Sequence, residues 1–383
     1  MSCEKLYQTI DELFDKYVAF WAEICTIESP TDDKAGVDAV GRYAAHAAQA
    51  LGWQAETFAQ PVSGNVVCIT LNPEAPGEAM ALSAHMDTVH PRGLFGDPPV
   101  RLEGDKIFGP GVIDCKGGIA AAFLAMEALD RCGFKARPVR LLLQSDEECG
   151  SRLSQRATIN HICERAQGAA AFINLEPSTA GKICVQRKGI VNFQFEITGV
   201  EAHSSQCAVR GANAIAEAAH KILAMEKLKD HEGLTCSVGT IQGGSVPNTV
   251  AGACRFCANV RFATPAQYEY SVAYAQQVAD TVHVPGCTCK VSQLSQRACM
   301  PRTERNLDLM AKMNRIFEAN GLSALEPVFN YGGSDAAEIT ETGVPCVDSM
   351  GPGGGGMHSA EEFGYIESLR QSARRIAAVI HDF

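Results

Sequence analysis

The sequence predicts an α/β protein in which a smaller domain is inserted into a larger one with a three-layer αβα sheet. In the first part of the chain, short apolar runs of strand length alternate with helical patterns, which is typical of a sheet covered on both faces. From about residue 183 the strands lengthen and alternate apolar with polar residues, and the first pattern resumes near residue 299. We therefore expect one domain of residues 1–182 and 299–383, and an inserted domain of residues 183–298.

Helical periodicity opens the chain. Apolar residues recur at three- and four-residue intervals from Leu6 to Ile24, which predicts an amphipathic helix. A second helix is predicted from Thr31, as its N-cap, to Leu51, with Gly52 as its left-handed stop. Buried strands are then expected at residues 66–71, 79–84, 139–144 and 170–175, with a helix of small residues at 117–129.

The inserted domain has a pattern of its own. Its expected elements are a strand at 185–198, a helix at 213–229, strands at 236–241 and 252–262, a helix at 265–282 and a strand at 288–294. This β-α-β-β-α-β order predicts a ferredoxin-like domain, with an antiparallel sheet and two helices on one face.

Composition excludes several classes of protein. The 33 basic and 44 acidic residues give a net charge of −11, which repels nucleic acid and anionic membranes, and no cluster of Lys and Arg offsets it. The longest apolar run, residues 117–126, is about half the roughly 20 residues that a bilayer requires. The 16 cysteines are too sparse for a disulfide scaffold. We expect reduced thiols, no secretory signal and a cytoplasmic protein.

Imidazole and carboxylate side chains follow the predicted buried strands, at the sheet edge where α/β proteins bind ligands. The candidate metal ligands are His85, Asp114, Glu148, Glu176 and His358. Two imidazoles and three carboxylates suit zinc, manganese or cobalt, and five such ligands fit two metals that share one carboxylate. Asp87, two residues after His85 and on the same face of the strand, would fix the tautomer of that ligand.

Three consecutive carboxylates, Asp146, Glu147 and Glu148, end one predicted strand. Like charges this close destabilise a fold unless a cation neutralises them, although a solvated turn is the alternative for this motif alone. Neighbouring residues point in opposite directions, so Glu148 can bind metal while Glu147 reaches a water molecule. A serine nucleophile is disfavoured because the sequence has no Gly-x-Ser-x-Gly motif, and we treat Cys115 and Cys149 as spectators.

Six motifs, in this order, resemble those of the M20 family of metallopeptidases, which includes glutamate carboxypeptidase, acetylornithine deacetylase, succinyl-diaminopimelate desuccinylase and aminoacylase. They are Ser83-Ala-His85-Met-Asp87-Thr-Val, Gly109-Pro-Gly-Val-Ile-Asp114-Cys-Lys-Gly-Gly, Asp146-Glu147-Glu148-Cys-Gly-Ser, Leu175-Glu176-Pro177, Gly332-Gly-Ser-Asp335-Ala and Met357-His358-Ser. The resemblance spans essentially the whole chain. It implies a zinc-exopeptidase-like fold with two Zn²⁺ per subunit, for which Co²⁺ or Mn²⁺ could substitute.

The resemblance also implies a role for each of these residues. Asp114 would bridge the metals, and a cis peptide would follow it. Glu148 and His358 would complete one metal site, and His85 and Glu176 the other. Asp87 would orient His85, while Glu147 would act as general base and then as general acid.

In the inserted domain, the resemblance implies a lid that also forms a homodimer. His203 would stabilise the oxyanion from the partner subunit, and Asn248 and Arg261 would hold the substrate carboxylate. Without the resemblance, nothing in the sequence distinguishes His203 from any other loop histidine. Arg261 would likewise be an ordinary charged residue at the end of a strand. The chain departs from the family at Cys115, where Asn, Asp or Met is usual, and it lacks a proline that often follows the lid histidine.

We therefore expect a dizinc carboxypeptidase-type hydrolase that cleaves an amide next to a free carboxylate and releases a C-terminal amino acid from short peptides or N-acyl amino acids. The Glu176-Pro177 pair and the motif at Gly332 are most similar to glutamate carboxypeptidase-like members. An N-acyl amino acid deacylase is the alternative with the same chemistry. A non-catalytic metal-binding scaffold is a remote third hypothesis, because neither the base nor a ligand is missing.

Overall fold

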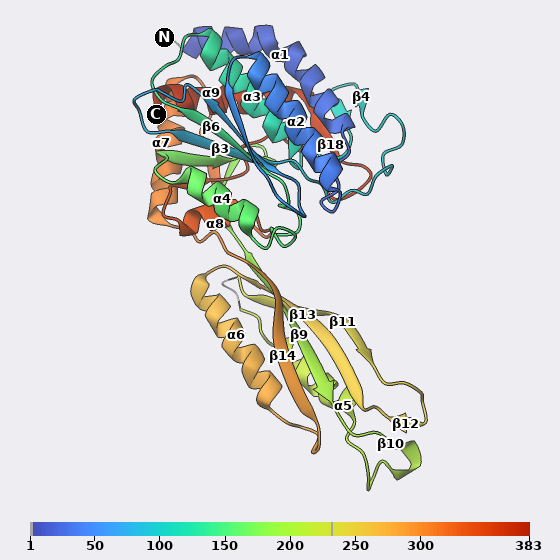
Figure 1. Ribbon diagram of the computed structural model, residues 1–383. Coiled ribbons are helices and arrows are strands. Elements are labelled where there is room, and N and C mark those ends of the chain that lie inside the picture. Colours follow the sequence, from blue (N-terminus) through green and yellow to red (C-terminus); the bar gives the residue numbers. More distant parts are fainter. Residues whose placement is uncertain (1–2, 231–232) are drawn as a thin grey trace. The chain divides into compact units, whose positions relative to one another are not determined.

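The computed structural model describes residues 3–230 and 233–383, which form two compact units (Figure 1). The first unit comprises the chain up to Val185 together with Arg302–Phe329 and Ser334–Phe383. The second comprises Gln186–Pro301 and Asn330–Gly333. Each unit has a hydrophobic core of its own.

A mixed six-stranded sheet is the centre of the first unit. Its strand order is β1 (Gln54–Phe58), β2 (Val66–Leu71), β6 (Val139–Gln144), β3 (Met80–His85), β7 (Ala171–Asn174) and β16 (Cys346–Val347). The last four of these run parallel, whereas β1 and β2 pair antiparallel. Every residue of β2 and β3 is buried, as expected for strands that are covered on both faces.

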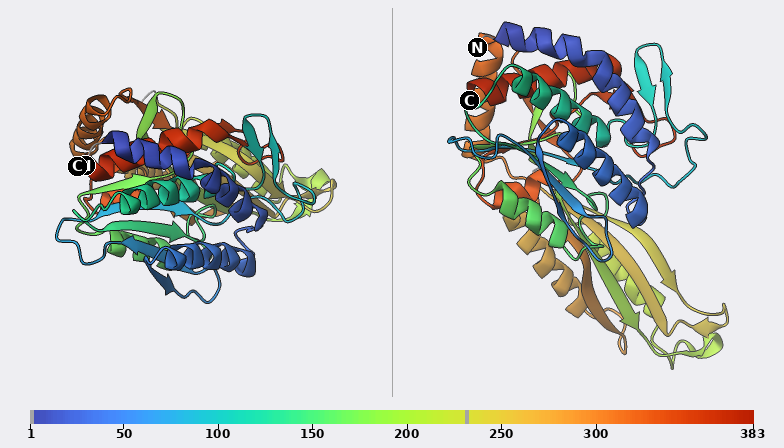
Figure 2. Two further views of the ribbon diagram at one scale, coloured as in Figure 1. Left: turned by 90° about the horizontal axis from the view of Figure 1, so that it is seen from above. Right: turned by 45° about the horizontal axis from the view of Figure 1, so that its top comes forward.

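Helices cover both faces of this sheet, so the predicted three-layer arrangement is present (Figure 2). One face carries α1 (Cys3–Thr26), α2 (Lys34–Ala50), α3 (Lys116–Arg131) and α9 (Ile366–Asp382), and the other carries α4 (Ala157–Ala166). Small residues let α3 pack between α1 and the sheet, and it is buried along nearly its whole length. The unit also contains α7 (Glu304–Ala319), α8 (Ala336–Glu341) and a small sheet of β17 (Gly354–Gly355), β18 (Phe363–Tyr365), β5 (Lys106–Phe108) and β4 (Arg101–Glu103).

The second unit is the predicted β-α-β-β-α-β domain. Its main elements are β9 (Gly189–Thr198), α5 (Ala214–Met225), β11 (Thr235–Gly243), β13 (Ala253–Phe262), α6 (Pro265–Asp280) and β14 (Thr288–Arg297). The strands form an antiparallel sheet in the order β11-β13-β9-β14. Alternate residues of β9 are buried, and Phe195 stacks on Phe256 of β13 with ring centroids 4.6 Å apart.

Two local predictions were wrong. The single strand expected at 185–198 is divided into β8 (Lys182–Arg187) and β9, because β8 pairs with β15 (Glu326–Asn330) and only β9 enters the four-stranded sheet. The N-cap of α2 is Asp33, whose carboxylate accepts a hydrogen bond from the backbone N–H of Gly36, and not Thr31. No helix within residues 3–230 and 233–383 has the length and apolar character needed to cross a membrane.

Candidate metal centre

Three adjacent strands bring three of the predicted ligands to one edge of the sheet. His85 is the last residue of β3, Glu148 follows the end of β6, and Glu176 follows the end of β7. Because β3 lies between β6 and β7 and runs parallel to both, the carboxyl ends of the three strands meet at the same edge. This is the edge at which open α/β sheets bind ligands.

Asp114 lies between the two histidines. It ends the turn that joins β5 to α3, and its peptide bond to Cys115 is cis. Its Oδ1 is 2.9 Å from His85 Nε2, and its Oδ2 is 3.3 Å from His358 Nε2. The two oxygens of one carboxylate therefore face two different imidazoles.

A further carboxylate stands beside each histidine. Glu176 Oε1 is 3.8 Å from His85 Nε2, and Glu148 Oε2 is 3.6 Å from His358 Nε2. The five residues thus form two groups that share Asp114. His85, Asp114 and Glu148 also offer ligand atoms that all lie within 4.8 Å of one another.

The buried acidic groups of the cluster indicate a site for a cation. Burial, together with the negative charge of Asp114, raises the pKa of Glu148 to about 10. Burial by itself would raise the pKa of Asp114 as well, but hydrogen bonds to His358 and His85 hold it below its usual value. Glu148 Oε1 is buried and has no hydrogen-bond partner among the described residues. The donor set, two imidazoles and three carboxylates, fits divalent zinc, cobalt or manganese.

Asp87 contacts both the histidine and the acidic loop after β6. Its backbone oxygen lies 3.0 Å and its Oδ1 3.4 Å from His85 Nδ1. Its carboxylate oxygens also accept hydrogen bonds from the backbone N–H groups of Glu147 and Glu148, each at 3.2 Å. The hydroxyl of Thr31 donates a further hydrogen bond to Asp87 Oδ2, at 2.8 Å. The buried Asp87 carboxylate therefore fixes the position of His85 relative to the loop of Glu147 and Glu148.

Glu147 is buried, with an exposed fraction of 6%. Its negative charge is among the causes that raise the pKa of Glu148 and of His358. The Glu147 carboxylate therefore lies beside the cluster, but the carboxylate oxygen that faces His358 belongs to Glu148.

Comparison with known proteins decides the family. The model of peptidase family M20/M25/M40 matches residues 81–382. The chain belongs to this family. Among curated relatives, carboxypeptidase G2 of Pseudomonas sp. (strain RS-16) is 28% identical over 94% of this chain and 87% of its own. Acetylornithine deacetylase of Myxococcus xanthus is 27% identical over 83% of this chain and 84% of its own.

Solved M20-type structures share the fold. A tripeptidase of Staphylococcus aureus subsp. aureus Mu50 aligns with a TM-score of 0.79 and 21% identity, over 96% of this chain and 97% of its own. A dinuclear metal-binding M20 peptidase of Bacillus subtilis aligns with a TM-score of 0.69 and 15% identity, over 97% and 98%. The predicted fold class and family are confirmed. The chain is an M20 metallopeptidase or amidohydrolase.

Cys115, where this M20 chain departs from the usual residue, is buried directly beside the cluster. Its thiol donates a hydrogen bond to the backbone oxygen of Leu175, at 3.1 Å. Its sulfur lies within 4.8 Å of ligand atoms of His85 and Glu176. Burial raises the pKa of the Cys115 thiol well above its usual value, which favours the neutral thiol.

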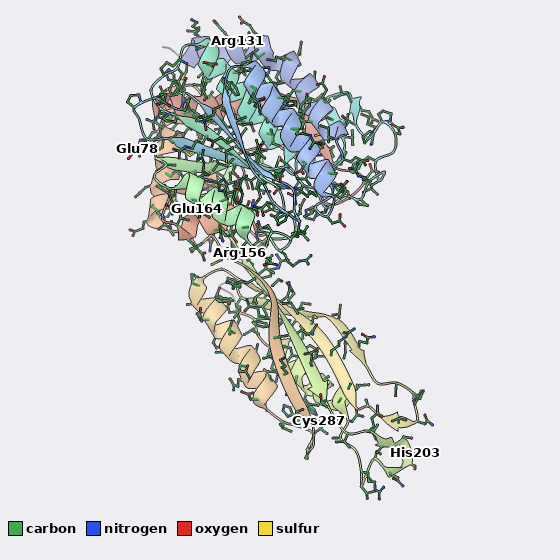
Figure 3. The ribbon with its side chains drawn as sticks, viewed as in Figure 1. Glu78, Arg131, Arg156, Glu164, His203 and Cys287 are labelled. Atoms are coloured by element: carbon green, nitrogen blue, oxygen red, sulfur yellow. The ribbon has the colours of Figure 1, made fainter. Side chains whose placement is uncertain are left out.

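His203 and Asn248 lie together in the second unit. His203 belongs to β10 (Ala202–His203), which pairs with β12 (Thr249–Val250), and the backbone N–H of Ser204 donates to the oxygen of Asn248 at 2.9 Å. Figure 3 labels His203 at the end of this unit that carries β10 and β12.

Arg261 lies near the other end of β13, where its guanidinium donates to Asn259 Oδ1 and to the backbone oxygen of Tyr331. Burial lowers its pKa. In the second unit, therefore, the three lid residues that the resemblance indicated fall into two separate groups.

Thr31 and Glu362 contact the site, although no motif in the sequence identifies either as a site residue. Thr31 binds Asp87, 56 positions away, and Glu362 accepts hydrogen bonds from the backbone of residues 113 and 114, nearly 250 positions away. No periodicity or local motif marks contacts of this kind.

Proposed function

We propose that the chain is a dizinc carboxypeptidase-type hydrolase. It releases a C-terminal amino acid, with glutamate as the preferred type, from short peptides or N-acyl amino acids. The observation that carries the proposal is the position of Asp114, whose two oxygens face His85 and His358 at 2.9 and 3.3 Å. A carboxylate in this position suits the bridge of a two-metal site.

The proposed ligands follow from the two groups. His85 and Glu176 would hold one Zn²⁺, His358 and Glu148 the other, and Asp114 both; Co²⁺ or Mn²⁺ could occupy the same donor set. When bound, the two ions would polarise the scissile carbonyl and lower the pKa of a water molecule in the site to near 7.

Glu147 would carry the proton. It would accept a proton from the attacking water and then donate it to the nitrogen of the departing amine, so that the amide bond breaks as the new C–O bond forms. Its burial next to the cluster supports this role. Asp87 would orient His85 and, through the backbone N–H of Glu147, hold the base in place.

Two neighbouring cations support a preference for an acidic C-terminal residue. Lys188 is buried, and burial together with the charge of Arg261 lowers its pKa, although Asp230 acts in the opposite direction. The Lys188 ammonium also lies over the ring of Tyr331, at 5.0 Å from the centroid, and Arg261 donates to the oxygen of the same residue. Two adjacent cations suit an amino acid with two carboxylates, as in glutamate.

The length of β13 supports an active homodimer. Asn248 and His203 adjoin the end of the strand at Ala253, and Arg261 is eight residues further along, roughly 26 Å at the rise of an extended strand. A small substrate held by Arg261 would therefore take Asn248 and the oxyanion donor His203 from another chain. β11 lies at an edge of the four-stranded sheet, so the side of this strand that faces away from β13 is available for such a contact.

The second candidate is an N-acyl amino acid deacylase, which the similarity to acetylornithine deacetylase favours. Mass spectrometry of products would separate the two. The panel contains dipeptides and N-acetyl, N-succinyl and N-benzoyl amino acids, each tested with zinc-loaded and with chelated enzyme. Chelator-sensitive release of glutamate from different acyl groups supports the carboxypeptidase, whereas selectivity for one acyl group supports the deacylase. Absence of release with zinc demonstrably bound would contradict both.

A further inference from the structure

Glu362 is a buried carboxylate close to the metal centre, and none of the roles above uses it. Its side chain is fully buried. Its Oε1 accepts hydrogen bonds from two consecutive backbone N–H groups, those of Ile113 at 2.9 Å and of Asp114 at 3.1 Å. Its Oε2 lies 2.6 Å from Nε2 of His90, which is itself buried.

Strand pairing places Glu362 next to the turn that carries Asp114. β18 begins at the next residue and pairs antiparallel with β5, with Phe363 opposite Phe108. The backbone N–H of Gly109 then donates to the oxygen of Glu362 at 3.3 Å, so the pairing continues into the turn that carries Asp114. The rings of His90 and Phe95 also form a T-shaped contact, with centroids 5.0 Å apart and planes at 84°.

We propose that Glu362, supported by His90, is a positioning residue that fixes Asp114 between the two halves of the metal centre. The inference rests on the ligand roles proposed above. A bridging carboxylate has to present one oxygen to each metal, so a small rotation of its backbone would misdirect both oxygens. Two hydrogen bonds to successive N–H groups fix that backbone.

The same carboxylate also links two ligands. Glu362 lies four residues after His358, so the loop that carries His358 is tied to the turn that carries Asp114. We expect the two ligands to keep their separation only while this link, which we call the Glu362 clamp, is intact. Loss of an outer partner of a ligand typically weakens metal binding 10- to 100-fold.

The second unit offers a matched control. Glu217 is also buried, accepts hydrogen bonds from two consecutive backbone N–H groups, those of His283 at 2.9 Å and Val284 at 2.6 Å, and has one ionic partner, Lys221, at 3.0 Å. Glu217 and Glu362 therefore make the same kind of contact, but Glu217 belongs to the other unit.

The test compares zinc affinities of the full-length apoprotein, measured by competition with a chromophoric chelator, and the visible spectrum of the Co²⁺ form. Glu362→Ala should bind zinc 10 to 100 times more weakly and show an altered Co²⁺ spectrum. Glu362→Gln should restore most of the affinity, because its amide oxygen can accept both N–H bonds while its amide nitrogen donates to His90. Glu217→Ala should lower the thermal midpoint but leave the zinc affinity unchanged.

Unchanged zinc affinity in Glu362→Ala, or an equal loss in Glu217→Ala, would overturn the proposal. If Glu362→Ala does not fold, the zinc affinity of Glu362→Asp tests the proposal instead. This variant keeps the charge but withdraws the carboxylate from the two N–H groups. Wild-type affinity in that variant would equally refute the clamp. Asp114→Ala distinguishes a failure of the Glu362 clamp from a failure of the ligand assignment: if this variant retains both metals, the ligand assignment itself is wrong.

Discussion

The carboxylate of Asp87 accepts a hydrogen bond from the backbone N–H of Glu147, with 3.2 Å between Oδ1 and N. The same oxygen lies 3.4 Å from His85 Nδ1. Asp87 therefore connects a proposed metal ligand to the proposed general base, and the geometry of both depends on one side chain that is fully buried.

Replacing Asp87 should damage binding and catalysis together. In Asp87→Ala, His85 loses an orienting partner and the loop of Glu147 and Glu148 loses two hydrogen-bond acceptors. We expect a 10- to 100-fold loss of metal affinity and a larger loss of kcat, measured at saturating metal. A variant with full kcat once metal is saturated would show that Asp87 does not position the base.

Replacing Glu147 should separate chemistry from metal binding. Glu147→Gln removes the proton acceptor but none of the five proposed ligands, so metal content should stay the same while kcat falls about 10²- to 10⁴-fold. Metal analysis and steady-state kinetics measure the two quantities. Glu164 on α4, which is exposed and labelled in Figure 3, provides the control: Glu164→Gln should leave both unchanged.

Mixed dimers should reveal a site shared between chains. Glu147→Gln and His203→Ala should each be nearly inactive alone, since each lacks one catalytic group. When the two variants are unfolded together and refolded as a mixture, some dimers contain one site with an intact Glu147 from one chain and an intact His203 from the other. Activity should reappear in the mixture. If the mixture is no more active than its components, His203 acts within its own chain or does not act at all.

Metal removal should lower the stability of the first unit. Without a cation, burial and the negative charge of Asp114 disfavour the ionised form of Glu148, as its raised pKa shows, whereas bound ions would favour it and bind only the folded site. Added zinc at 100 times its dissociation constant should stabilise the folded state by about 2.7 kcal/mol per site. Scanning calorimetry before and after chelation measures the shift, and Asp114→Ala should respond to zinc much less than wild type.

Glu127 on α3 should make stability depend on pH far from the metal centre. It is buried, and its carboxylate accepts hydrogen bonds from Tyr17 and Lys16, each at 2.5 Å, and from Arg131 at 2.7 Å. Burial alone would raise the pKa of Glu127, but the hydrogen bonds from Lys16 and Tyr17 and the nearby positive charges lower it overall.

A carboxylate with a lowered pKa stabilises the fold above its ordinary pKa of 4.5, and this contribution disappears as the pH falls through the folded-state value. Glu127→Gln should therefore lower stability at pH 7 by about 1–3 kcal/mol. Because glutamine does not titrate, the difference from wild type should narrow below pH 4.5. Thermal midpoints measured from pH 7 to pH 4 test this, and a difference independent of pH would contradict it.

Local periodicity was sufficient for most of the secondary structure. The strands β2 and β6 have the predicted bounds, because continuous runs of Val, Ile and Leu leave few alternatives to a strand buried on both faces. The boundary between β8 and β9 could not be predicted in this way, since it depends on pairing with β15, about 140 residues further along the chain.

The N-cap of α2 shows the same limit on a smaller scale. Thr31 and Asp33 are both acceptable caps by residue type. Asp33 caps the helix, whereas the hydroxyl of Thr31 donates to Asp87 in the metal centre. The choice between them depends on a carboxylate that folding brings to Thr31 from another segment.

The sequence by itself determined the family, the fold class and the identity of the candidate ligands, because ligand chemistry depends on residue type and strand periodicity is local. The tertiary structure decided how those ligands are grouped, with one oxygen of Asp114 toward His85 and the other toward His358. It also decided that Glu362 supports Asp114. Distances of this kind depend on which strands become neighbours, and hydrogen bonds between distant segments exist only after the chain has folded.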